Sequence, residues 1–144
     1  MRIIYRNDLS ELARLAADIE AFAETNGLDL EIVHTFNLCL DEVFTNIVSY
    51  AYADDLPHEI ILELQATPRE VMACIRDDGR AYDPLTEAPV PDLHASIEER
   101  KIGGLGVHFV KQLMTRVAYR REGGWNVLEM ARAHGPAKAS AAQV

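Results

Sequence analysis

The chain has 144 residues, close to the commonest size of a single domain, and 49% of them are hydrophobic, which is enough for one core. Its 23 acidic residues outnumber 14 basic ones and give a formal net charge of -9, which would repel a phosphate backbone and argues against direct binding of nucleic acid. No apolar run reaches the length of a membrane span, and the first residues lack a signal-peptide cleavage site. We therefore expect a cytoplasmic protein with no membrane segment.

The N-terminal third of the chain predicts one strand and two helices. Residues 1–6 (MRIIYR) favour a short strand, and apolar residues at helical spacing then predict a helix over residues 9–25. Asp29 can cap a second helix, which carries a long apolar stripe. We expect this helix to fray near Asp54 and to end before Pro57, because the residue preceding a proline is disfavoured in the helical conformation.

The rest of the chain predicts two hairpins, with a loop and a helix between them. Residues 58–66 and 70–77 alternate or are continuously apolar, and a short connection joins them, which is typical of a hairpin. Residues 83–102 contain several prolines and no sustained period, so they predict a long loop with one helical turn near residues 96–100. A glycine cluster then precedes a segment of helical spacing, and a last hairpin turns at Gly123-Gly124.

This order of elements predicts an α+β fold, namely a two-layer α/β sandwich with helices on one face of a mixed, mostly antiparallel sheet. We expect the domain to span residues 1–134, and residues 135–144, which are small and featureless, to form a disordered tail. Cys39 and Cys74 lie in apolar segments and lack the spacing of a zinc or redox site. We interpret both as small buried hydrophobic residues.

A carboxylate and an amide lie one turn apart in the second predicted helix. Glu42 and Asn46 are four residues apart in LCLDEVFTNIVSYAY, so both project from the same side of the helix, beside its apolar stripe. A partly desolvated acid suits proton transfer, and an amide oxygen can ligate a hard cation such as Mg²⁺. The alternative is an ordinary pair of surface residues, and other motifs must decide between the two.

A second candidate site lies where the predicted strand 70–77 ends, in IRDDGRAYDP. Two carboxylates and a glycine follow the apolar strand, which places Asp77 at the edge of the sheet, where a ring amine could be bound. Gly79 has no side chain and would let a planar ligand approach the backbone closely. The alternative is a simple Asp-Gly turn between a strand and a loop.

The third motif is the glycine cluster in KIGGLGVHFVKQLM. Gly103, Gly104 and Gly106 lie at the predicted start of a helix, where bare backbone N–H groups and the positive end of the helix can face an anion. The spacing is neither that of the lysine-containing P-loop nor that of the dinucleotide-binding fingerprint. A phosphate site and a flexible hinge are therefore both open interpretations of this cluster.

The order of the three motifs resembles that of the GHKL superfamily of ATPases and kinases. The likeness is carried by E-x-x-x-N on a helix, D-x-G at a strand end and a glycine box that opens a later helix. More closely, LDEVFTNIVSYAY, IRDDGRAYDP and GGLGVHFVKQLM are similar to the anti-sigma factor serine/threonine kinases that regulate bacterial transcription. The likeness extends from about residue 8 to residue 131 and implies the GHKL (Bergerat) fold.

The resemblance implies a role for individual residues. Asn46 would ligate Mg²⁺ and Glu42 would be the catalytic base, while Asp77 would bind the adenine amino group with Gly79 beside the base. Residues 83–102 would act as a lid over the nucleotide. The implied ATP-binding residues are Asn46, Asp77, Gly79, Tyr82, Gly103, Gly104, Leu105, Gly106 and Asn126, the last in place of a threonine that helps to hold adenine in relatives.

The function implied by the resemblance is that of an ATP- and Mg²⁺-dependent protein serine/threonine kinase. It would phosphorylate an anti-anti-sigma protein of the STAS type, sequester a sigma factor and form a homodimer. Two alternatives stay open: a regulatory module that binds nucleotide and sequesters a partner without efficient phosphotransfer, and the catalytic domain of a sensor histidine kinase. His58-Glu59 is similar to a phosphoacceptor pair, but it begins a predicted strand and has no long helical hairpin around it.

Overall fold

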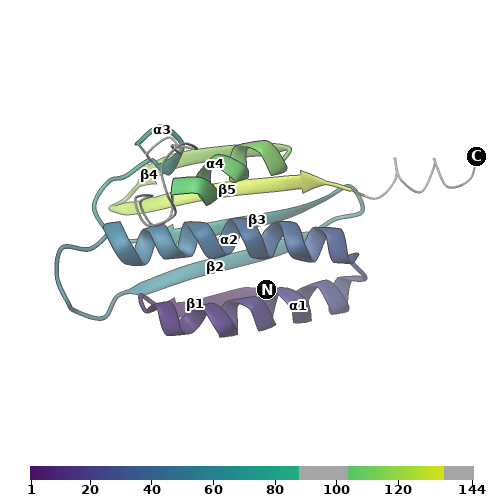
Figure 1. The fold of residues 1–144 in the computed structure, drawn as a ribbon, viewed down its shortest axis with the longest axis horizontal. Coiled ribbons are helices and arrows are strands. Elements are labelled where there is room, and N and C mark those ends of the chain that lie inside the picture. The colour runs from purple at the N-terminus through teal and green to yellow at the C-terminus, as the bar shows by residue number, and fades with distance from the viewer. Residues whose placement is uncertain (88–103, 135–144) are drawn as a thin grey trace, which may run out of the picture.

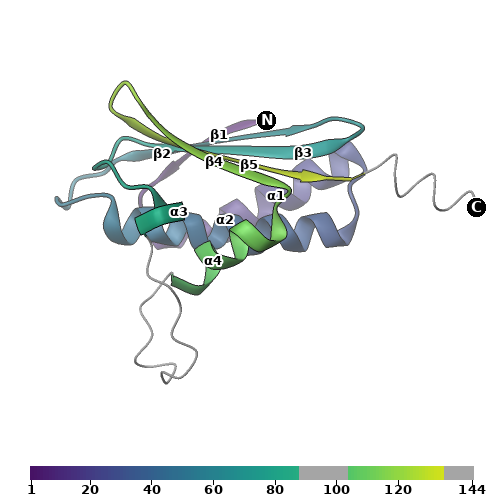
Figure 2. The same cartoon turned by 90° about the horizontal axis from the view of Figure 1, so that it is seen from above.

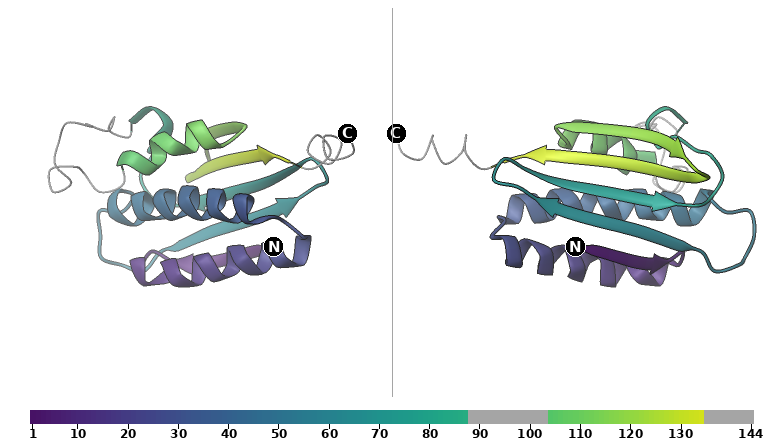
Figure 3. Two further views of the ribbon diagram at one scale, coloured as in Figure 1. Left: turned by 45° about the vertical axis from the view of Figure 1, so that its right-hand side comes forward. Right: turned by 180° about the vertical axis from the view of Figure 1, so that it is seen from behind.

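The structure is a computed structural model in which residues 1–87 and 104–134 are described, residues 104–108 by their backbone alone. A five-stranded sheet forms one layer, and helices on one of its faces form the other (Figure 1, Figure 2). Its main elements are β1 (Arg2–Arg6), α1 (Leu12–Asn26), α2 (Leu30–Tyr50), β2 (Glu59–Ala66), β3 (Glu70–Asp77), α3 (Pro84–Glu87), α4 (Gly104–Leu113), β4 (Arg116–Glu122) and β5 (Trp125–Ala133). Seen from behind, the other face of the sheet carries no helix of the described chain (Figure 3).

The strands follow the order β1-β2-β3-β5-β4 across the sheet, and each neighbouring pair is antiparallel. The two predicted hairpins are the pairs β2–β3 and β4–β5, and β5 joins them by pairing with β3. The predicted α+β sandwich is therefore confirmed, except that all the strand pairs described are antiparallel, where a mixed, mostly antiparallel sheet was predicted. The pairing of β3 with β5 matters for the site, because it brings the end of the first hairpin beside the start of the last strand.

The long helix α2 supplies most of the helical side of the core. Asp29 caps it as predicted, its carboxylate accepting a hydrogen bond from the Ile32 backbone N–H at 3.1 Å. The buried stripe of α2 faces alternate residues of β2 and β3, which point toward the helices because successive strand residues face opposite sides. Its members include Val33, Phe36, Leu40 and Val43.

The end of α2 differs from the prediction. The helix ends at Tyr50, instead of fraying toward Asp54, and Ala51 is its C-cap. The physical reason is a tertiary contact: the Arg80 backbone N–H donates to the Ala51 carbonyl at 2.9 Å, and Arg80 Nε donates to the Tyr50 carbonyl at 2.9 Å. Carbonyls that would otherwise be orphaned at the helix end are thus satisfied by the segment that follows β3.

Several smaller predictions can be compared with the described residues. Helix α1 begins at Leu12, not near residue 9, because a short 3-10 turn (Leu9–Glu11) precedes it; the last hairpin turns at Gly123 and Gly124, both with positive φ, as expected. Cys39 is fully buried and Cys74 partly buried, and burial raises the pKa of the Cys39 thiol to about 11. None of the helices described has the length and apolar composition that crossing a bilayer requires.

Two predictions fall on residues that the structure does not describe. The helical turn expected near residues 96–100 and the tail over residues 135–144 both lie outside the described ranges. The first residues of the predicted loop do lie inside them, and they form the short helix α3, which the sequence did not indicate. Pro84 opens this helix, as its fixed φ allows at a first helical position.

Candidate functional site

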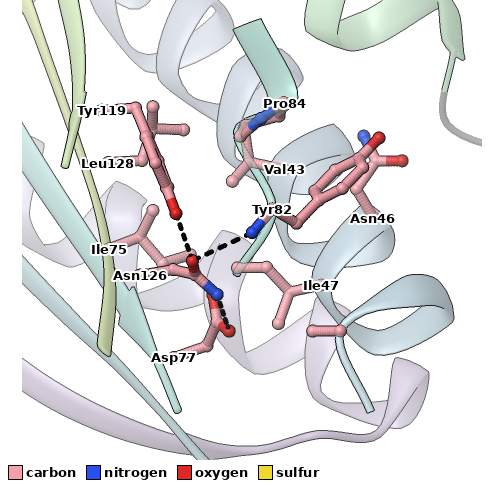
Figure 4. Close-up of a pocket in the computed structure, with 11 residues that line it drawn as sticks. Val43, Asn46, Ile47, Ile75, Asp77, Tyr82, Pro84, Tyr119, Asn126 and Leu128 are labelled. Atoms are coloured by element: carbon pink, nitrogen blue, oxygen red, sulfur yellow. Dashed lines mark hydrogen bonds between the residues drawn. The ribbon is translucent and has the colours of Figure 1, made fainter. Parts of the chain in front are cut away.

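A pocket lies at one end of the sheet, between α2, the end of β3 and the start of β5 (Figure 4). Its walls are largely aliphatic and aromatic, with only a few polar groups among them, which is the usual composition of a small-molecule site. The lining residues are Val43, Asn46, Ile47, Ala51, Ile75, Asp77, Tyr82, Pro84, Tyr119, Asn126 and Leu128. Four predicted residues from three separate parts of the chain, namely Asn46, Asp77 with Tyr82, and Asn126, therefore meet in one pocket.

Strand register explains why two of the polar residues meet. Asp77 is the last residue of β3, and its partner directly across the antiparallel pair is Asn126 of β5. Side chains opposite each other on one face of such a pair are close enough to interact. Ile75 and Leu128 form the next inward-facing pair and provide an apolar wall beside them.

Asp77 is a buried carboxylate, with 4% of its surface exposed. Its Oδ1 atom accepts one hydrogen bond from the Gly79 backbone N–H at 3.0 Å and another from Asn126 Nδ2 at 2.9 Å. Burial raises the pKa of this carboxyl, and the two donated hydrogen bonds oppose that effect because they favour the charged form. Both hydrogen bonds that Asp77 accepts from described residues thus go to the same oxygen.

All the hydrogen-bonding positions of the Asn126 side-chain amide are occupied by other groups of the protein. Its Nδ2 donates to Asp77 Oδ1 and to the Arg80 carbonyl at 2.8 Å, and its Oδ1 accepts from the Tyr82 N–H at 3.2 Å and from Tyr119 Oη at 2.5 Å. An asparagine amide has two donor and two acceptor positions, and all four are taken. The arrangement favours an indirect role for Asn126, through Asp77, over the direct adenine contact implied by the resemblance.

Gly79 is required by the fold at the point where β3 leads into the pocket. A Cβ atom on Gly79 would lie 2.5 Å from the Ala51 carbonyl oxygen and 2.6 Å from the Ala51 Cβ. The sequence suggested that Gly79 makes room for a ligand, whereas the structure shows that the C-terminus of α2 occupies that space. Arg121 of β4 also donates to the Gly79 carbonyl at 2.8 Å, so this turn is held from two sides.

Tyr82 borders the pocket at the base of the predicted lid. Its ring lies beneath the Arg80 guanidinium, whose carbon is 5.0 Å from the ring centroid, and burial raises the pKa of the Tyr82 hydroxyl. Figure 4 shows the ring on the same side of the pocket as Pro84 and Asn46. The predicted placement of Tyr82 at the nucleotide site is consistent with this position.

Tyr119 is a site residue that the sequence motifs did not reveal. It is on β4, opposite Leu128, and its hydroxyl reaches Asn126 inside the pocket. The alternation of the strand, which turns Val117 and Tyr119 inward while Arg116 and Arg120 are exposed, is the signal that could have indicated it. This alternation identifies Tyr119 as a site residue only once β4 is known to pair with β5.

Glu42 and Asn46 occupy successive turns of α2, as their spacing predicted. Asn46 is 5% exposed and lines the pocket, whereas Glu42 is half-buried, with its Oε1 atom fully covered, and does not line the pocket. The carboxylate and the amide therefore have different surroundings despite sharing one side of the helix. This arrangement suits a carboxylate that acts on the phosphate end of a nucleotide whose base lies in the pocket.

Helix α4 begins within the glycine cluster, at Gly104, so Gly104, Leu105 and Gly106 belong to its first turn; Gly103 lies outside the described residues. The N–H groups of a first helical turn have no partner within the helix and carry the positive end of its dipole. The helix packs against α2 and α3, and Lys111 donates to the Leu85 carbonyl of α3. The packing brings α4 beside α2, and a phosphate site at the first turn of α4 stays a prediction.

The residues present fit a Mg²⁺ ion only if the nucleotide supplies most of its ligands. Within residues 1–87 and 104–134, no three histidine, cysteine or acidic side chains are grouped so that they could hold a metal. The amide oxygen of Asn46 is a hard ligand on the pocket wall. Mg²⁺ commonly takes one or two protein ligands and completes its shell with phosphate oxygens and water, which matches this donor set.

Comparison with known proteins places residues 5–132 in the histidine kinase-like ATPase domain. The serine/threonine-protein kinase BtrW of Bordetella bronchiseptica is 37% identical over 127 residues, which cover 85% of this chain and 89% of that protein. The serine-protein kinase RsbW of Listeria monocytogenes is 26% identical over 120 residues, or 81% of this chain and 75% of that protein. A blue-light activated histidine kinase of Erythrobacter litoralis shares the fold, with a TM-score of 0.59 and 18% identity, and the chain spans 42% of its length.

Proposed function

This chain belongs to the histidine kinase-like ATPase domain family, and from that premise we propose that it is an ATP-dependent protein serine/threonine kinase that acts as an anti-sigma factor. The membership confirms the resemblance to the GHKL superfamily. The two sequence relatives are similar over most of their length and are named serine/threonine- or serine-protein kinases, which supports this activity. The likeness to the histidine kinase of Erythrobacter litoralis shows a shared fold only. It therefore does not favour a histidine kinase over a serine/threonine kinase.

The single observation that carries the proposal is the meeting of Asp77 and Asn46 in one largely apolar pocket. Each motif had an ordinary explanation in the sequence, as a turn or as a surface helix pair. Neither explanation accounts for a carboxylate and an amide, 4% and 5% exposed, that line the same cavity. Buried polar groups at the wall of an apolar pocket are typical of a site that binds a flat ligand with polar edges.

In the proposed complex, the base of ATP lies in the pocket and the phosphates extend along α2 toward α4. Asp77 accepts a hydrogen bond from the amino group of adenine, and the apolar walls at Ile75 and Leu128 cover the ring. Backbone N–H groups in the first turn of α4 bind phosphate oxygens. Asn46 and the phosphate oxygens would hold Mg²⁺, which neutralises phosphate charge when bound.

Phosphoryl transfer needs positioning and charge stabilisation more than covalent help from the protein. We assign Glu42 as the general base: its carboxylate accepts the proton of a serine or threonine hydroxyl on a partner protein. The hydroxyl oxygen forms a bond to the γ-phosphorus, the bond between this phosphorus and the bridging oxygen breaks, and ADP leaves. The half-buried position of Glu42, one turn before Asn46, supports this assignment.

The partners proposed follow from the family resemblance. The phosphate acceptor is an anti-anti-sigma protein of the STAS type, and the protein that the kinase sequesters is a sigma factor. The kinase acts as a homodimer in the cytoplasm. The net charge of -9 supports protein partners over nucleic acid.

Replacing Glu42 by Gln tests the proposed activity. The variant keeps the size of the side chain but loses the proton acceptor, so transfer from ATP to an anti-anti-sigma protein of the same organism should fall by about 10²- to 10⁴-fold. ATP affinity should stay within about threefold of the wild type, because Glu42 does not line the base pocket. The measurements are transfer of radiolabelled phosphate and equilibrium binding of ATP.

Asp41→Asn is the matched control, because Asp41 is the exposed neighbour of Glu42 on α2. This variant loses the same charge and should transfer phosphate at the wild-type rate. If Glu42→Gln also transfers at that rate, the base assignment is wrong. If the wild type binds ATP and a sigma factor but transfers no phosphate, the chain is the sequestering regulator that the sequence left open.

A further inference from the structure

The orientation of the Asn126 amide is determined by two backbone groups. The Tyr82 backbone N–H can only donate, and it lies 3.2 Å from one end of the amide, which must therefore be the oxygen. The Arg80 carbonyl can only accept, and it lies 2.8 Å from the other end, which must be the nitrogen. The amide of Asn126 consequently has to present an N–H group to Asp77.

Asp77 receives a second donor on the same oxygen. The Gly79 backbone N–H, which also can only donate, lies 3.0 Å from Asp77 Oδ1. Two donors at Oδ1 leave no position for a proton on that atom, because a protonated oxygen would place O–H against N–H. Both donors also favour the ionised carboxylate, in which Oδ2 can only accept a hydrogen bond. The other oxygen, Oδ2, is the part of the Asp77 carboxylate that remains to contact a ligand in the pocket.

From this geometry we propose that Asn126 is a positioning residue that makes the site selective for 6-aminopurine nucleotides, by donating to Asp77 Oδ1 and so favouring the ionised carboxylate, whose other oxygen accepts from the base. The inference rests on the proposed function, since it concerns the base of the ATP bound there. Asn126 itself does not contact the nucleotide. It reaches the base through Asp77, and it couples this carboxylate to the backbone of residues 80 and 82, where the segment toward the predicted lid begins.

The expected selectivity follows from hydrogen-bond chemistry. The 6-amino group of adenine donates a hydrogen bond, which an ionised Asp77 Oδ2 accepts. The 6-oxo group of hypoxanthine or guanine presents an acceptor at this position, so two acceptors would face each other in a buried site. A ligand that leaves buried polar groups unpaired is strongly disfavoured, and ATP should therefore bind more tightly than inosine triphosphate, which differs at this group.

Asp77→Asn is the sharpest test, because the new side chain has almost the same shape. With two donors still converging on the Oδ1 position, the amide oxygen must stay there, and the amide nitrogen must point to the ligand. The variant should lose about 10- to 100-fold in ATP affinity and should bind inosine triphosphate more tightly than ATP. The measurement is equilibrium binding of both nucleotides to the full chain, with Mg²⁺ present.

Asn126→Asp tests the positioning role itself. This variant places a carboxylate where the donor stood, so it cannot donate to Asp77 Oδ1 unless the pair retains a proton. The preference for ATP over inosine triphosphate should fall at least about tenfold relative to the wild type. Leu64→Ala, a buried core change toward the opposite end of β2 from the Asp77 pairing, is the control for loss of stability and should leave the preference unchanged.

The possible outcomes separate this inference from the proposed function. An inverted preference in Asp77→Asn, with a reduced preference in Asn126→Asp, supports the positioning role. The inference is overturned if Asp77→Asn loses affinity for both nucleotides alike, or if folded Asn126→Asp keeps the wild-type preference. If Asn126→Asp does not fold, the inversion in Asp77→Asn decides alone, and if the wild type binds no ATP, the proposed function itself is wrong.

Discussion

The two halves of the candidate site are built from different kinds of structure. The half assigned to the base is formed by strand ends, where Asp77 and Asn126 are opposite each other in the sheet and are joined by a hydrogen bond. The half assigned to phosphate and catalysis rests on helices, with Asn46 and Glu42 on α2 and the first turn of α4 nearby. Strand register holds the Asp77 carboxylate in one position, whereas helix ends offer backbone N–H donors that can bind more than one phosphate group.

This contrast separates selectivity from chemistry within one domain. A change on the sheet should alter which base is bound, and a change on α2 should alter the affinity for the metal-bound phosphates or the transfer step. The predictions that follow test that separation, beginning with the largest expected effect.

Asn46→Ala should have the largest effect on the phosphate half. Removal of the metal ligand should lower ATP affinity in Mg²⁺ by about 100-fold, because a Mg²⁺ ion with few protein ligands depends strongly on each of them. Calorimetric titration with ATP, with and without EDTA, measures this. Without Mg²⁺, the variant and the wild type should bind ATP within a few-fold of each other, and a loss of the same size in EDTA would contradict the assignment of Asn46 as the metal ligand.

Gly79→Ala should have the next largest effect, and it acts on stability. The new Cβ would stand 2.5 Å from the Ala51 carbonyl oxygen, a backbone atom at the end of α2 that cannot move without breaking its bond to the Arg80 N–H. We expect the free energy of unfolding to fall by about 2 kcal/mol, as for overpacking of a tight contact. Urea unfolding measures this, and a variant as stable as the wild type would show that the turn can shift at no cost.

Asp77 should make ATP binding and stability respond oppositely to pH. In the proposed complex the ionised carboxylate binds adenine. Because burial raises the pKa of Asp77, ATP affinity should decline at a higher pH than the unperturbed value of about 3.9 would suggest. A raised pKa in the folded state means that the contribution of Asp77 to stability is greatest below the pKa of the unfolded chain and is lost as pH rises through the folded pKa. Urea unfolding between pH 4 and 7 should show a weaker loss of stability in Asp77→Asn than in the wild type.

Tyr119→Phe should have the smallest effect. The change removes one of the two donors to Asn126 Oδ1 and leaves the Tyr82 N–H in place, so the amide should keep its orientation. A loss of about 1 kcal/mol in the free energy of unfolding is expected for one partly buried hydrogen bond. Urea unfolding measures that loss, and a much larger one would indicate that Tyr119, not the backbone, orients Asn126.

Local signals in the chain accounted for most of the elements. The apolar stripe of α2, the alternation in β2 and β3 and the Gly123-Gly124 turn each depend on neighbouring residues, and each was predicted from them. The end of α2 was misjudged because it depends on Arg80, which is distant in the sequence but donates to the last carbonyls of the helix. A helix boundary that depends on a tertiary contact cannot be predicted from the periodicity of neighbouring residues.

The sequence by itself determined which chemical groups are candidates for the site, because the order of the motifs that contain Glu42, Asn46, Asp77 and the glycine cluster resembles that of the GHKL superfamily. The tertiary structure alone decided how these groups are used. It placed β5 beside β3, so that Asn126 meets Asp77, and it filled the space at Gly79 with the end of α2. The physical reason is that strand order and helix packing join residues that are far apart in the chain, and the hydrogen bonds that orient Asp77 exist only across those contacts.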